Sequence, residues 1–302
     1  MKLSINDFDF LDSFDDLGEH YLDSHYKHKI SLFSLKINAN DFDYQNLQDN
    51  LLEPMVNFSL SRAVKAEYAD KPAKLSKKAR EKFIEYVRNK GELGELILYS
   101  FLESHLNAPK ILSKLELKTS TSHYVNGADG VHFLKLQNGD YQIIFGESKT
   151  EVGITRGISN AFKSISEFKA GVNNKGAKKS GLPYEKSLIS DHLANETFSD
   201  DEKQFVKSII YPSRKDNFYV DDAFGIFIGY EMKIEDSDKT LPNSEFREKI
   251  KKKIKAEVEG KFSHILKKIT QYDLSGHNFY IYFLPITDLN KNRKLIQKGI
   301  TL

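Results

Sequence analysis

The chain has 302 residues, and its 45 Lys and Arg residues nearly balance its 43 Asp and Glu residues, for a formal net charge of +2. It contains no cysteine, which excludes disulfide frameworks, thiolate metal sites and cysteine nucleophiles. No apolar run approaches the roughly 18 residues that span a membrane, and the acidic N-terminal region is unlike a signal peptide. We therefore expect a soluble, cytoplasmic protein without a membrane partner.

The small net charge hides a strong local asymmetry. Residues 1–50 contain ten Asp and Glu residues against four Lys residues, whereas residues 71–90 contain eight Lys and Arg residues against two Glu residues. Residues 247–268 contain nine Lys and Arg residues against three Glu residues. Basic blocks of this kind can contact phosphates, but a Lys-rich helix more often presents a solvated face, so both interpretations stay open.

Hydrophobic periodicity and turn residues predict the following elements in chain order. They are a strand at 30–37, a helix at 51–68, a helix that Ser76 caps, an apolar helix at 92–106, strands at 111–118, 130–137 and 141–149, a helix at 155–170, a strand at 224–231, a Lys-rich helix at 244–269 and a strand at 278–286. The order favours an α/β fold with a mixed central sheet flanked by helices, because the last strand–helix–strand unit is typical of a crossover onto one sheet.

A domain boundary is predicted near residue 70, because Pro72 disfavours a helical conformation at Lys71. It separates an N-terminal accessory region, residues 1–70, from a main domain, residues 71–302, whose last part is the strand–helix–strand extension. The acidic accessory region is either an ordinary packed layer or, as we prefer, a docking surface for a partner.

Asp129 and the triplet Glu147-Ser148-Lys149 form the sharpest chemical feature of the sequence. Glu-x-Lys triplets begin at five positions, namely Glu116, Glu147, Glu167, Glu231 and Glu259. Only Glu147 has an Asp that a hairpin could bring close, since Asn138-Gly139-Asp140 is a strong turn signal. With a three-residue loop, Gln137 would face Tyr141, and Asp129 would project from the same face as Glu147 and Lys149.

Two carboxylates and an ammonium group at one place are suited to phosphodiester hydrolysis with a bound divalent cation. The alternative is an ordinary Glu–Lys pair on a surface hairpin. Glu95 favours the first interpretation, because a buried helix rarely retains a carboxylate without a partner.

The order Gly91-x-x-x-Glu95, then Asp129, then Glu147-x-Lys149 resembles the motif of the PD-(D/E)xK nuclease superfamily. Three stretches, GELGE (91–95), NGADGVHF (126–133) and FGESK (145–149), are also similar to the nuclease subunit of Hachiman anti-phage systems, the HamA family. The likeness extends over most of the chain. The residue before Asp129 is Ala128 rather than proline, a departure that leaves the assignment standing.

This resemblance implies a PD-(D/E)xK-type αβββαβ core that cleaves DNA with Mg²⁺, with Mn²⁺ able to substitute. It implies that Asp129 and Glu147 are metal ligands, that the main-chain carbonyl of Ser148 adds a ligand, and that Lys149 is the catalytic lysine. Glu95 would be the helix acid and a candidate further ligand. The resemblance also implies a partner, a HamB-like helicase or ATPase subunit that senses aberrant DNA and controls the nuclease.

Several other side chains near these motifs are weaker candidates. Possible contacts to DNA are Arg156 and Lys163 on the helix at 155–170, and Lys175, Lys178 and Lys179 in the Gly- and Lys-rich loop at 171–181. A solvated face is an equal alternative for the two residues of the helix, whereas a mobile loop without DNA contact is favoured for the three lysines of residues 171–181. His123 and His132 could act as general bases, but structural or surface roles are favoured.

The leading hypothesis is a metal-dependent DNA endonuclease that acts as the effector of an anti-phage defence system under the control of a helicase. The first alternative is a stand-alone restriction- or repair-type nuclease on the same core. The second is a non-catalytic DNA-binding or regulatory subunit, for which substitutions of Glu147 and Lys149 would leave function intact.

Overall fold

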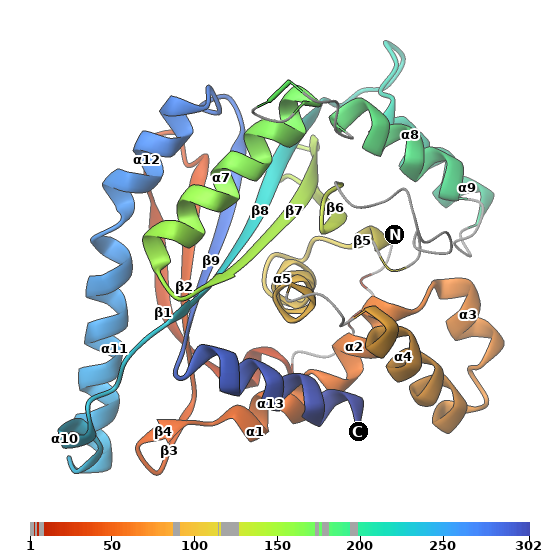
Figure 1. The fold of residues 1–302 in the computed structure, drawn as a ribbon. Helices are drawn as coiled ribbons and strands as arrows, with labels where there is room; N and C mark the ends of the chain where they lie inside the picture. The colour runs from red at the N-terminus through yellow and green to blue at the C-terminus, as the bar shows by residue number, and fades with distance from the viewer. Residues whose placement is uncertain are drawn as a thin grey trace.

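A seven-stranded mixed sheet forms the centre of the protein, with helices on both faces (Figure 1). The computed structural model describes residues 3, 5, 9–86, 91–113, 115, 127–172, 175–176, 181–193 and 199–302. Across the sheet, the strands are β1 (Phe14–Tyr21), β2 (His28–Leu35), β9 (Asn278–Ile286), β8 (Val220–Glu231), β7 (Tyr141–Glu151), β6 (Gly130–Lys135) and β5 (Lys110–Ser113). The predicted α/β fold with a mixed central sheet is confirmed.

The four central strands, β2, β9, β8 and β7, are parallel to one another, while β1, β6 and β5 are antiparallel to their neighbours. β8 and β9 are almost continuously buried, as is typical of parallel strands covered on both faces. The chain passes from β8 to β9 through α11 (Asn243–Glu259) and α12 (Phe262–Gln271), so the predicted crossover onto one sheet is present.

The remaining described elements surround this sheet. They are η1 (Leu11–Ser13), α1 (Tyr44–Asn50), α2 (Leu52–Ser59), α3 (Arg62–Glu67), α4 (Pro72–Tyr86), α5 (Glu92–Ser104), α7 (Ile154–Ala170), α8 (Leu182–His192), α9 (Asp200–Ile210), α10 (Asp236–Lys239) and α13 (Leu289–Thr301), with β3 (Ile37–Asn38) and β4 (Asp41–Phe42) in a small separate sheet. The described elements in this part follow in the order α5, β5, β6, β7, α7, α8, α9 and β8, and the PD-(D/E)xK-type core stays a prediction. Among the described residues, no helix combines the length and apolar character needed to cross a bilayer.

Helices α5 and α7 cover opposite faces of β7 and β8. A Cβ atom added to Gly94 on α5 would lie 2.8 Å from Ser148 Oγ, whereas one added to Gly157 on α7 would lie 3.0 Å from Ile228 Cγ2. Side chains alternate between the faces of a strand. Ser148 therefore faces α5, and Glu147 and Lys149 face α7.

The close approach at Gly94 yields a stability prediction. Gly94→Val is expected to lower the free energy of unfolding by about 1–3 kcal/mol, because the added atoms would collide with Ser148 and Thr150 in a packed interface. Gly276→Val is the control, since a Cβ there would meet no atom within 4 Å, and it should change stability by less than about 0.5 kcal/mol. Urea unfolding compares the two variants, and equal losses would contradict the close packing of α5 on β7.

Two predicted helices have different bounds in the structure. α4 begins at Pro72 rather than after Ser76, since proline is well suited to the first turn of a helix. The Lys-rich helix expected at 244–269 is divided into α11 and α12 at Gly260 and Lys261.

The helix expected at 51–68 is also divided. Leu60 adopts an extended conformation after α2, and Ser61 then caps α3 by accepting a hydrogen bond from the Val64 amide. Propensity alone did not reveal this break, because neither glycine nor proline marks it.

The N-terminal region contributes to the same sheet as the rest of the chain. β2 pairs in parallel with β9, and β1 forms the edge beyond it. Part of its acidic charge is paired within the chain, since Asp15 lies 3.0 Å from Lys251 on α11. The domain boundary near residue 70 and the docking role of this region stay predictions.

Candidate functional site

The hairpin of β6 and β7 determines where Asp129 and Glu147 meet. The predicted pairing of Gln137 with Tyr141 is wrong, because Lys135 pairs with Tyr141 and Val131 pairs with Phe145. The loop is longer than expected, since the Leu136 amide donates a hydrogen bond to the Asp140 carbonyl oxygen. The register therefore shifts by two residues, and an even shift leaves every side chain on its expected face.

Asp129 directly precedes β6, where this strand begins alongside the middle of β7. Its amide donates to the Gly146 carbonyl oxygen (2.9 Å), and its carboxylate Oδ2 accepts a hydrogen bond from the Ser148 amide (2.8 Å). The side chain of Asp129 thus continues the backbone ladder by one step. Because the N–H and C=O of a strand residue point to the same edge, the Ser148 carbonyl is directed towards this edge as well.

A cavity of about 260 Å³ brings the predicted residues together. Its lining includes Glu95, Asp129, Glu147, Ser148 and Lys149. Lys149 Nζ forms an ion pair with Glu147 Oε1, and their side chains are 28% and 14% exposed. The site is therefore partly screened from solvent but open to a ligand.

Glu95 reaches this cavity from the other side of the sheet. It lies in the first turn of α5 and is buried, whereas Glu147 and Lys149 face α7. Both sides meet at the open edge of β7, since the pairing of β6 with β7 stops at Phe145. The wall on the α7 side consists of Ser164, Ile165 and Phe168, which sequence reasoning did not assign to the site.

The donor set fits Mg²⁺. This ion is typically held by one or two carboxylates, with water and substrate phosphates completing its shell. Asp129 and Glu147 supply two carboxylates, and the Ser148 carbonyl oxygen is directed towards the same edge. Within the described part of the chain, no three Asp, Glu or His side chains form a metal-binding cluster, so an all-side-chain cage is not present there.

Comparison with known proteins places the chain in a family. A family model described as HamA matches residues 9–300, nearly the whole sequence. The chain belongs to the HamA family. No curated protein matches it. Membership makes it a component of a Hachiman anti-phage defence system, which has more than one component.

The three described candidate DNA contacts of this HamA-family chain lie outside the cavity lining. Arg156 is 76% exposed and pairs with Glu151 (3.4 Å), and Lys163 lies 4.0 Å from Glu167 on the next turn of α7. Lys175 is described but does not line the cavity. Two further candidates, Lys178 and Lys179, lie outside the described residues. All five stay predictions.

His132 is a core residue rather than a base at the site. It is 1% exposed, and its Nδ1 donates a hydrogen bond to the Ala108 carbonyl oxygen (2.8 Å). Burial, with a smaller contribution from Lys110, lowers the pKa of His132 to about 4, although the bond to Ala108 raises it. The ring is therefore neutral at pH 7. His123 lies outside the described residues.

This buried ring predicts a pH dependence of stability. The pKa of His132 is about 4 in the folded chain, against about 6.5 for an unfolded one, so the unfolded state binds more protons between these values. The free energy of unfolding should therefore fall by up to about 3 kcal/mol as the pH is lowered from 6.5 to 4.

Urea unfolding of His132→Asn across this pH range measures the contribution of His132. The variant loses packing at every pH, but its dependence on pH should be shallower than that of the wild type. His25→Asn is the control, because His25 is exposed and should leave the dependence unchanged. An unaltered slope in His132→Asn would contradict the assignment.

Proposed function

We propose that this chain is the Mg²⁺-dependent DNA endonuclease of its Hachiman system, and that a helicase-like ATPase subunit controls it. The observation that supports the activity is the shared cavity of Asp129, Glu147, Ser148 and Lys149. A divalent ion bound there would polarise the scissile phosphate and activate water for attack. The membership of the chain in a multi-component defence system supports the partner.

Each residue of the cavity has a distinct task in this proposal. Asp129 and Glu147 hold the cation, and the hydrogen bond from the Ser148 amide fixes one oxygen of Asp129. The Lys149 ammonium, already paired with Glu147, can bind a phosphate oxygen and offset the negative charge that develops in the transition state. It can also orient the attacking water.

Glu95 adds a third acidic group to the lining of the cavity. It lies next to Gly94, where α5 packs closely on β7, so its carboxylate is held in place beside the strands. Since no three described Asp, Glu or His side chains form a metal cluster, Glu95 would act on the cation through a water molecule rather than as a third direct carboxylate ligand beside Asp129 and Glu147.

Nicking of a supercoiled plasmid tests the proposed activity. The purified chain is incubated with Mg²⁺ or with EDTA, alone and with the helicase-like subunit of the same system plus ATP. We expect nicking with Mg²⁺, none with EDTA, and a marked increase when the partner engages DNA. Full cleavage by the chain alone, unaffected by the partner, would favour the stand-alone nuclease, and no cleavage under any condition would contradict the proposal.

A further inference from the structure

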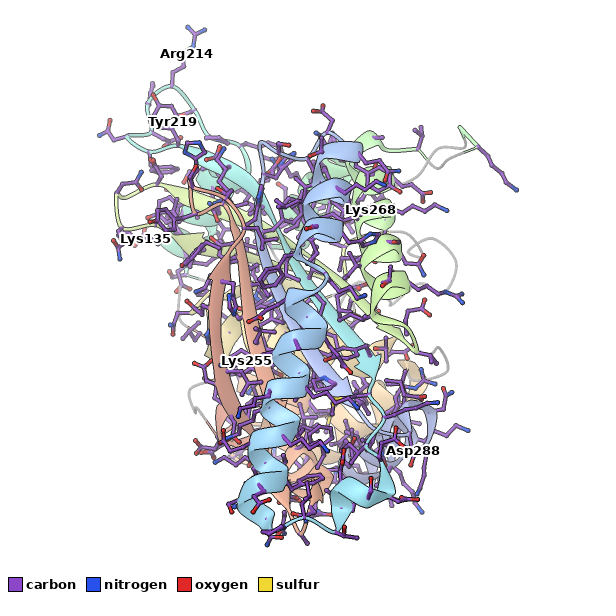
Figure 2. The ribbon with its side chains drawn as sticks, turned by 90° about the vertical axis from the view of Figure 1, so that its left-hand side faces the viewer. Lys135, Arg214, Tyr219, Lys255, Lys268 and Asp288 are labelled. Atoms are coloured by element: carbon purple, nitrogen blue, oxygen red, sulfur yellow. The ribbon has the colours of Figure 1, made fainter. Side chains whose placement is uncertain are left out.

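Helices α7 and α12 lie side by side on one face of the protein (Figures 1 and 2). Ser159 Oγ on α7 is hydrogen-bonded to His264 Nε2 on α12 (3.0 Å), and Lys169 Nζ donates to the carbonyl oxygen of Asp273 beyond the end of α12 (2.8 Å). The two helices therefore form one continuous surface.

This surface is strongly basic on the α12 side. The segment from Lys261 to Tyr272 contains Lys261, His264, Lys267 and Lys268 and no Asp or Glu. Among the described residues, none of these lysines forms an ion pair with a carboxylate. Helix α11 differs, since its run of lysines, residues 249–255, has two glutamates before it and two after it.

The pKa of His264 is lowered partly by the lysines of this surface. Burial is the largest cause that lowers the pKa of His264, and repulsion from Lys268, Lys261 and Lys267 lowers it further. The three lysines lie within four residues of His264 on α12, so their charges repel one another there, and a bound anion would relieve this repulsion.

The outer face of α7 connects this basic surface to the cavity. Successive residues of an α-helix are about 100° apart around its axis. Around α7, Ser159 faces α12 and Ser164 lines the cavity, and the positions of Lys163 and Arg156 lie between these two. These positions span about 140° of the helix. Lys163 and Arg156, each paired with a glutamate, thus lie on the solvent side between α12 and the cavity.

We propose that α12 and the outer face of α7 bind the phosphate backbone of duplex DNA and guide one strand into the cavity. The inference rests on the proposed function and assigns its substrate-binding surface. Adjacent helix axes lie about 8–10 Å apart, so the surface is broad enough to contact several phosphates at once. Such contacts position DNA without reading its sequence.

The salt dependence of DNA binding tests this surface. Fluorescence anisotropy measures the affinity of the full chain for a labelled duplex of about 24 base pairs in EDTA, between roughly 50 and 300 mM NaCl. In the triple variant Lys261→Gln, Lys267→Gln and Lys268→Gln, the slope of log K against log[NaCl] should be shallower by about 2–3, and binding at about 100 mM NaCl should be at least roughly tenfold weaker.

The matched control is Lys291→Gln, Lys294→Gln and Lys298→Gln on α13. This helix also has exposed lysines and no acidic residue, but it packs against α1 and α4 rather than α7. The control has the same net charge as the α12 variant, and it should bind DNA as the wild type does. Equal losses in both variants, or an unchanged slope in the α12 variant, would overturn the inference.

Failure of this inference can be told apart from failure of the proposed function. Because binding is measured without metal, the anisotropy result does not depend on cleavage. Normal Mg²⁺-dependent cleavage with an unchanged slope in the α12 variant would overturn only the surface. If the α12 variant still binds DNA but no longer binds the helicase-like subunit, the DNA-binding inference is overturned, and the surface is assigned to a protein partner.

Discussion

Lys149→Met is expected to lower Mg²⁺-dependent DNA cleavage by about a thousandfold or more while the chain stays folded. The substitution keeps the length of the side chain but removes the ammonium group that pairs with Glu147 at the edge of the cavity. Loss of one positioned acid–base or charge-stabilising group typically costs about 10²–10⁴ in rate. Plasmid nicking measures the rate, and thermal unfolding verifies the fold.

A matched control for this substitution is Lys186→Met. Lys186 also forms an ion pair with a carboxylate, that of Asp222 (2.8 Å), and both side chains are 23% exposed. It does not line the cavity. We expect cleavage by Lys186→Met to stay within about threefold of the wild type, a margin well below the loss expected from a catalytic group. Equal activity of Lys149→Met and the wild type would favour the non-catalytic alternative.

Asp129→Asn and Glu147→Gln are expected to abolish stabilisation of the chain by Mn²⁺ or Mg²⁺. A ligand that binds only the folded state, present at about 100 times its dissociation constant, adds about 2.7 kcal/mol to the free energy of unfolding. For a chain of this size, this corresponds to a rise of a few degrees in melting temperature. Asn at position 129 can still accept the hydrogen bond from the Ser148 amide, so the hairpin should persist.

Thermal unfolding with and without the cation measures this effect. Asp222→Asn removes a carboxylate of similar exposure away from the cavity, and it should retain the full shift in melting temperature. A shift that survives in both Asp129→Asn and Glu147→Gln would mean that the cation binds elsewhere.

The sheet was predictable because its strongest signals are local. The apolar runs of β8 and β9 are typical of buried strands. The turn residues Asn138-Gly139-Asp140 predict the hairpin between β6 and β7. The register of the β6–β7 hairpin was not predictable. It depends on the hydrogen bond from the Leu136 amide to the Asp140 carbonyl oxygen, which gives a longer loop than the turn residues alone suggest. The error in register was even, so Asp129, Glu147 and Lys149 keep their expected faces, whereas an error of one residue would have turned Asp129 to the other face. Their roles at the site stay predictions.

Burial of a carboxylate on α5 does not by itself identify a site. Glu103 is fully buried, yet its carboxylate accepts hydrogen bonds from the amides of Lys110 and Ile5. Glu95 differs because it lines the cavity with Asp129 and Glu147. The sequence presents both as acidic residues on an apolar helix, and only the position of α5 relative to β7 separates them.

The wall formed by α7 was missed although part of its signal is visible in the sequence. Ala161, Ile165 and Phe168 follow helical spacing and are buried, so they predict an inward face. What the sequence does not contain is the rotation of this face relative to β7, which places Ser164 and Phe168 beside Glu147. That rotation is set by contacts such as Gly157 against Ile228.

Anomalous diffraction from crystals soaked with Mn²⁺ tests the cation site most directly. We predict a peak in the cavity at coordination distance from the carboxylates of Asp129 and Glu147 and from the carbonyl oxygen of Ser148, and no such peak in Asp129→Asn. A saturating soak that places Mn²⁺ elsewhere, or leaves both carboxylates without a bound ion, would contradict the account.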